Sequence, residues 1–93
     1  MAIRLVVTFQ ALPGKGNDFA RAFAPIIEEV NKEKGCEQYE LFTSRESPDK
    51  LVLLELWTDQ ASLDAHSAAM RSRGPSPTAP FRAEAPSMER YGG

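Results

Sequence analysis

The sequence is short of several residue types on which common protein chemistry depends. Its 93 residues include one cysteine, Cys36, and one histidine, His66. A lone cysteine excludes an internal disulfide. A zinc site of nitrogen and sulfur ligands needs three or four such groups, more than one chain can supply here. A metal site shared across a dimer axis, or a single axial ligand to haem, remains open. Motifs for a metal, flavin or nucleotide are also missing, so we expect no cofactor.

Strong charge of one sign and long apolar runs are missing as well. The formal net charge is -2, and no cluster of basic residues alternates with aromatic ones, so we expect no nucleic-acid partner. The apolar part of residues 1–10 is too short for a membrane span and lacks the layout of a signal peptide. These absences, with the single thiol, predict a cytoplasmic protein without a membrane partner.

The residues that are present predict one globular domain over residues 1–93. Hydrophobic residues make up 42% of the chain and charged residues 26%, which is typical of a globular protein too small for a second core. Period-two alternation predicts strands over 3–11, 37–44, 51–57 and 87–91. Helical periodicity predicts one helix over 18–34 and another from a cap at Thr58 or Asp59 to about residue 71.

The helix ends and the last loop have their own signals. Asn17 is the expected N-cap of the first helix and Gly35 its C-cap. Pro25 falls inside the apolar stripe of that helix, so we expect one bent helix. Four prolines within residues 74–86 predict a surface loop. The element order predicts an α+β, ferredoxin-like βαββαβ fold: a four-stranded antiparallel sheet with two helices on one face.

The third strand is apolar on both of its faces, although helices cover only one. We expect the uncovered face to leave Leu51, Leu53 and Trp57 in water. Burying a large apolar side chain contributes about 1.5–3 kcal/mol relative to exposure, and a contiguous bare patch marks an interface or a ligand cavity. A second copy closing over the sheet would bury this patch. The pattern therefore predicts a homodimer through the open sheet face.

Three side chains are candidates for chemistry. His66 is the sole imidazole and the best proton carrier near neutral pH; its alternative is a structural hydrogen bond, for example to Glu55. Trp57 could stack a planar substrate or belong to the core. Glu55 needs a partner if it is buried. It could orient His66, but we favour pairing with an arginine, at position 4, 82 or 90. Cys36 is expected to be a small core residue.

Several motifs resemble the antibiotic biosynthesis monooxygenase family, a branch of the dimeric α+β barrel superfamily. They are Pro13-Gly14-Lys15, Gly35-Cys36, Tyr39-Glu40-Leu41, Leu54-Glu55-Leu56-Trp57, and Ala61, Leu63 and His66. The resemblance runs from residue 3 to about 70. It implies a homodimer with a cavity between sheet and helices in each subunit. Characterised family members oxidise phenols, quinols or aromatic polyketides without metal or flavin.

The sequence also departs from the family pattern. Relatives that degrade haem carry an asparagine on the first strand, whereas residues 5–8 here read Leu-Val-Val-Thr. Residues 74–86 replace a segment that is usually helical and often aromatic.

The function that we expect is a cofactor-independent monooxygenase acting on a small aromatic phenol or quinol. His66 would be the base or proton shuttle and Trp57 the stacking wall. The expected pocket residues are Glu55, Phe9, Tyr39 and Phe42, although such strand aromatics are more often core residues. The alternative is a non-catalytic dimer that binds a small molecule, with haem as a lesser candidate.

Overall fold

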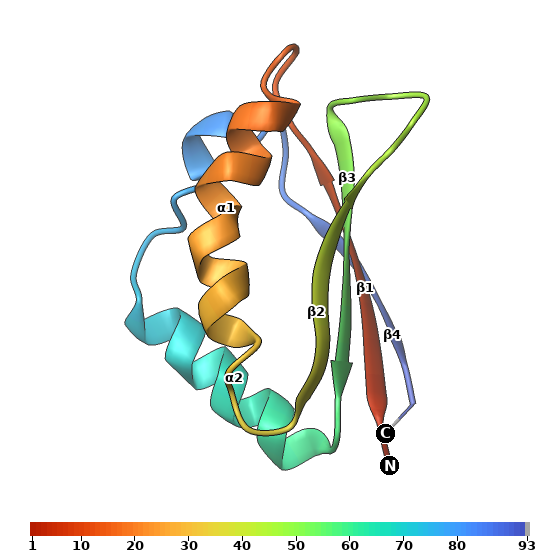
Figure 1. Ribbon diagram of the computed structural model, residues 1–93, viewed down its shortest axis with the longest axis vertical. Coiled ribbons are helices and arrows are strands. Elements are labelled where there is room, and N and C mark those ends of the chain that lie inside the picture. The colour runs from red at the N-terminus through yellow and green to blue at the C-terminus, as the bar shows by residue number, and fades with distance from the viewer. Residues whose placement is uncertain (93) are drawn as a thin grey trace.

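The computed structural model describes residues 1–92 and confirms the predicted order of elements. They are β1 (Ile3–Gln10), α1 (Gly16–Val30), β2 (Cys36–Thr43), β3 (Lys50–Trp57), α2 (Gln60–Ser72), a single 3-10 turn η1 (Ala79–Phe81) and β4 (Ser87–Tyr91). The strands form one antiparallel sheet in the order β2-β3-β1-β4. Both helices lie on the same side of this sheet (Figure 1). The fold is therefore ferredoxin-like α+β, as the sequence predicts.

Tertiary contacts set the ends of α1, and the predicted caps of this helix were wrong. The helix begins at Gly16, before Asn17, because the carboxylate of Asp49 accepts the backbone N–H groups of Gly14 and Gly16. It ends at Val30 and not near residue 34. Pro25 lies inside the helix, as expected.

Asn31 takes the place that we expected for Gly35 at the end of α1. The side chain of Asn31 donates to the carbonyl groups of Ile27 and Tyr39, which ties the end of the helix to the edge strand β2. Gly35 instead adopts a left-handed conformation, with φ at +83°, in the turn that leads into β2. The second helix begins as predicted, with the Asp59 side chain accepting the backbone N–H of Ser62.

The helices cover the face of β3 that was expected to be bare. Leu51, Leu53 and Trp57 are buried in the core, and the opposite set, Val52, Leu54 and Leu56, lies on the uncovered face. Alternation separates the two sets but cannot say which one meets the helices when both are apolar. The bare face is thus real, but the residues assigned to it were the wrong ones.

The proline-rich segment lies mostly on the surface, as predicted. It is anchored to the end of β1, since the N–H of Leu12 donates to the carbonyl of Phe81 and the N–H of Ala83 to that of Gln10. Its one buried side chain is that of Thr78. Within residues 1–92, no helix is long and apolar enough to span a membrane.

Candidate functional site

A chain of polar groups crosses the core where α2 faces β3. His66 on α2 is 6% exposed, and its Nδ1 lies 3.0 Å from Oε1 of Glu33, in the turn after α1. Its Nε2 faces Oε1 of Glu55 on β3 at 4.0 Å. The same Glu55 oxygen accepts a 2.9 Å hydrogen bond from Nε1 of Trp57. One imidazole thus lies between two carboxyl groups.

Aromatic rings enclose this polar chain. The Trp57 ring lies against the His66 ring, with 4.5 Å between centroids and an interplanar angle of 32°. Tyr39 on β2 meets the imidazole edge-on at 5.4 Å. These contacts fix the plane of the imidazole and exclude water from it, which strengthens electrostatic interactions inside the cluster.

Burial changes the acidity of the groups around His66. The pKa of the Glu55 carboxyl is raised by desolvation, which the Trp57 hydrogen bond and the charge of His66 offset only in part. Desolvation, with the negative charges of Glu55 and Glu33, also raises the pKa of Tyr39 far above its usual range. The thiol pKa of Cys36 is raised by burial and by both glutamates. Glu55 can therefore hold a proton at higher pH than an exposed glutamate, while Tyr39 and Cys36 stay protonated near neutral pH and are not available as bases.

The structure brings together four of the six predicted site residues. His66, Trp57, Glu55 and Tyr39 are in one cluster. Phe9 lies elsewhere in the core, against Phe19 and Phe23. Phe42, at 44% exposure, is on the opposite face of the sheet, because its partner across the ladder is Val52.

The partners of these residues differ in part from our expectation. The preferred arginine partner for Glu55 was wrong, since its hydrogen bond comes from Trp57. Glu33 was missed. It is 33 residues from His66 in sequence, and no local motif marks it.

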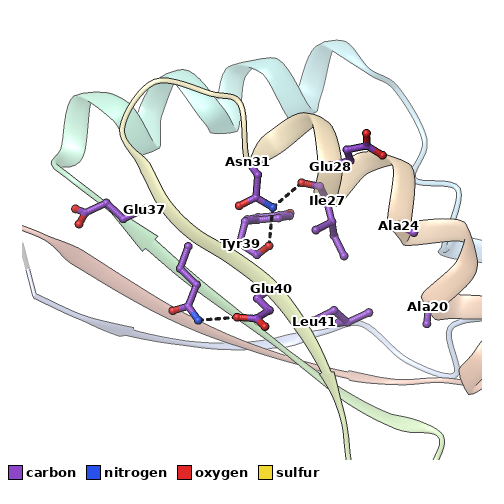
Figure 2. A pocket seen from close by; sticks show the side chains of 10 residues that line it. Ala20, Ala24, Ile27, Glu28, Asn31, Glu37, Tyr39, Glu40 and Leu41 are labelled. Carbon is purple, nitrogen blue, oxygen red and sulfur yellow. Dashed lines mark hydrogen bonds between the residues drawn. The ribbon is translucent and has the colours of Figure 1, made fainter.

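A groove lies between α1 and the edge strand β2 (Figure 2). Its volume is about 570 Å³. Ala20, Ala24 and Ile27 form the helix side, and Tyr39 and Leu41 the strand side. The rim carries three glutamates, at positions 28, 37 and 40. Such a rim disfavours an anionic ligand.

The second cavity, of about 400 Å³, lies between α2 and β4. Its apolar lining consists of Leu5, Leu63 and Met88, and its polar lining of Gln60, Asp64, Ser67 and Arg90. Leu5 pairs with Glu55 across the β1–β3 ladder, and Leu63 precedes His66 by one turn of α2. Because such neighbours lie side by side, these two leucines form the wall between this cavity and the polar cluster.

The arrangement around His66 does not fit haem ligation. An axial ligand needs a free imidazole nitrogen that faces an open space. Here Nδ1 is bound to Glu33, and Nε2 faces Glu55 inside a packed core. His66 lines neither cavity. Among residues 1–92, no group of three or more histidine, cysteine, aspartate or glutamate side chains is placed to hold a metal ion.

The fold and the buried cluster define a small α+β protein of the ferredoxin-like class. The family model described as antibiotic biosynthesis monooxygenase matches residues 2–73. The chain therefore belongs to this family, as the motifs indicated. No curated protein sequence matches it significantly.

Solved structures share this fold over nearly the whole chain. A conserved protein from Methanosarcina mazei Go1 is 32% identical, with 98% of this chain and 91% of that chain covered and a TM-score of 0.86. A protein from Shewanella oneidensis is 29% identical, with 97% and 88% covered and a TM-score of 0.83. A third, from Caulobacter crescentus CB15 and assigned to the antibiotic biosynthesis monooxygenases, is 27% identical, with 97% and 87% covered and a TM-score of 0.85.

Proposed function

We propose that this protein is a cofactor-independent monooxygenase that acts on a small aromatic phenol or quinol. The observation that carries the proposal is family membership over residues 2–73, together with a buried imidazole held between two carboxyl groups. In such a reaction a phenol and dioxygen give a quinone and water. One oxygen atom enters the product, and the substrate supplies the electrons. The protein needs to supply a dry site, orientation and proton transfer.

The cavity between α2 and β4 suits this substrate better than the groove beside β2. A phenol becomes electron-rich when it loses its proton, so a phenolate has to be stabilised. Arg90 places a guanidinium group beside the apolar lining of this cavity, where Asp64 is the single carboxylate among the described residues. The groove beside β2 surrounds its apolar floor with three glutamates, which would repel a phenolate. A volume of about 400 Å³ is within the usual range for small-molecule sites.

In this proposal His66 and Glu55 receive the proton that the substrate loses. The raised pKa of Glu55 makes it a stronger base than an exposed glutamate, which brings it nearer to the pKa that general base catalysis requires. Trp57 holds Glu55 by its hydrogen bond and packs against His66. Substrate must displace the wall side chain Leu63 to reach them.

The test is oxygen uptake by metal-free protein against a panel of hydroquinones and polycyclic phenols. We expect saturable uptake, with one atom of labelled dioxygen in the product, and a loss of about 100-fold or more in His66→Ala. Met70→Ala, on the same face of α2, is the matched control for loss of a side chain that packs against the core. Unchanged turnover in His66→Ala would remove the role of His66. Uptake at the buffer rate throughout would contradict the oxygenase proposal for these substrates.

The functional unit in this proposal is a homodimer closed through the bare face of the sheet. Val6, Val52, Leu54 and Leu56 form an apolar stripe along β1 and β3 on that face, beside the exposed ring of Phe42. Nothing in the chain from residue 1 to 92 covers this side of the sheet (Figure 1). A second copy would bury the stripe against its own equivalent.

One observation favours a second function, the binding of a hydrophobic small molecule without turnover. Neither His66 nor Glu55 lines either of the two cavities described above, and Leu5 and Leu63 separate them from the one between α2 and β4. The polar cluster would then serve stability alone. Ligand-dependent thermal stabilisation without oxygen uptake would support this function.

A further inference from the structure

Glu33 joins the buried cluster to the solvent. Its side chain is 24% exposed, whereas those of His66 and Glu55 are 7% exposed. Its backbone is held on both sides, because its N–H donates to the carbonyl of Val30 and its carbonyl accepts the N–H of Cys36. The turn therefore presents the carboxyl group in a fixed place.

The contact with Glu33 assigns the proton on the imidazole. An ionised carboxylate can only accept a hydrogen bond, so the 3.0 Å contact requires a proton on Nδ1. In a neutral imidazole the other nitrogen, Nε2, is then an acceptor. That nitrogen faces Glu55 at 4.0 Å, and the oxygen there already accepts the N–H of Trp57. This Glu55 oxygen therefore has a hydrogen-bond donor without a proton on Nε2.

We propose that Glu33 is a positioning residue: it holds His66 in the Nδ1–H tautomer and aims the basic Nε2 at Glu55. The arrangement makes Glu55, His66 and Glu33 a path for one proton. Glu55 passes a proton to Nε2 once the 4.0 Å gap closes, and the Nδ1 proton moves toward Glu33 and on to solvent. The use of this path in turnover rests on the proposed function, but the tautomer does not.

The chain offers a clean spectroscopic test, because His66 is its sole histidine. Long-range proton–nitrogen correlation spectra of labelled protein at about pH 9, where a free imidazole is neutral, will show one set of ring signals. We expect the Nδ1–H pattern in the wild type and in Glu33→Gln, since the amide oxygen still accepts. In Glu33→Ala we expect a shift toward the Nε2–H tautomer, because Glu55 is then the remaining acceptor.

Glu28→Ala removes an exposed carboxylate from α1 and is expected to leave the ring signals unchanged. Glu33→Met, which keeps the side-chain length without an acceptor, replaces the alanine variant if that variant does not fold. An Nε2–H pattern or a doubly protonated ring in the wild type overturns the proposal. So does a tautomer in Glu33→Ala and Glu33→Met that matches the wild type.

A kinetic arm tests whether turnover uses this arrangement. With a substrate found by oxygen uptake, we expect Glu33→Ala to lower kcat by at least about 10-fold with KM nearly unchanged, and Glu33→Gln to retain more of the wild-type kcat. A kcat in Glu33→Ala equal to that of the wild type would overturn the use of the path. Absence of turnover in the wild type and in both Glu33 variants would count against the proposed function. The spectra would still test whether Glu33 sets the tautomer of His66.

Discussion

At the scale of single residues, Glu55 is an acidic group in a place that favours its neutral form. It is buried among core side chains, and its hydrogen bond from Trp57 compensates only part of the lost hydration. A raised folded-state pKa means that the folded chain binds this proton more tightly than the unfolded chain. The contribution to stability is then full below the usual pKa of 4.5 and is lost as pH rises through the raised value.

Glu55→Gln tests this cost of burial. The amide oxygen can still accept the Trp57 hydrogen bond, but the side chain no longer ionises. We expect the variant to be more stable than the wild type at pH 7 to 8, and the gain to disappear below about pH 4. Urea midpoints measured from pH 4 to 8 give the comparison, with Glu28→Gln as the control for loss of one negative charge. Equal destabilisation of Glu55→Gln at every pH would show that its hydrogen bond outweighs its desolvation.

At the scale of elements, Gly35 sets how closely the turn after α1 approaches α2. A Cβ on Gly35 would collide with the side chain of Ser62 in the first turn of α2. The carbonyl of Gly35 also accepts the N–H of Thr58, just before that helix. This close approach brings Glu33, in the turn, within hydrogen-bond distance of His66, on the helix.

Gly14 gives a matched control for a substitution at Gly35. Both glycines have a positive φ, +78° and +83°, but a Cβ on Gly14 meets no atom within 4 Å. We expect Gly14→Ala to cost about 1–2 kcal/mol for the left-handed backbone, and Gly35→Ala about 1–3 kcal/mol more for the collision. Denaturant unfolding of both variants measures the difference. Equal losses in the free energy of unfolding would mean that the first turn of α2 moves to accommodate the added methyl group without a measurable penalty.

The same elements show what the sequence could predict and what it could not. Strand alternation placed β1 and β3 to within a residue or two, because one face of each strand is buried and the pattern repeats every second residue. The ends of α1 were missed because the side chains of Asp49 and Asn31 fix them through contacts distant in sequence. The face of β3 was missed because both faces are apolar.

The candidate site was predictable to a similar extent. His66 and Trp57 were found because each is the one residue of its kind and because the family motif contains both. Glu33 belongs to a polar turn with several charged neighbours, and its role depends on how closely this turn packs against α2. That packing is a property of the folded chain, which no spacing in the sequence reports.

At the scale of the whole molecule, one face of the sheet has no helix or strand of residues 1–92 packed against it (Figure 1). Leu54 is at its centre, paired with Val6 on one side and Glu40 on the other. A lysine at position 54 could reach Glu40 in a lone subunit, but it would be buried without a partner against a second sheet. A buried unpaired charge costs several kcal/mol, so the same substitution is mild in a monomer and severe in a dimer.

Leu54→Lys therefore separates the two states. We expect the wild type to sediment as a dimer at micromolar concentration, and Leu54→Lys to weaken the dimer by at least about 100-fold while its circular dichroism stays that of the folded chain. Leu12→Lys makes the same chemical change at an exposed leucine in the loop after β1 and should remain dimeric. A monomeric wild type would leave the apolar stripe to some other partner, and a dimeric Leu54→Lys would place the interface elsewhere on the molecule.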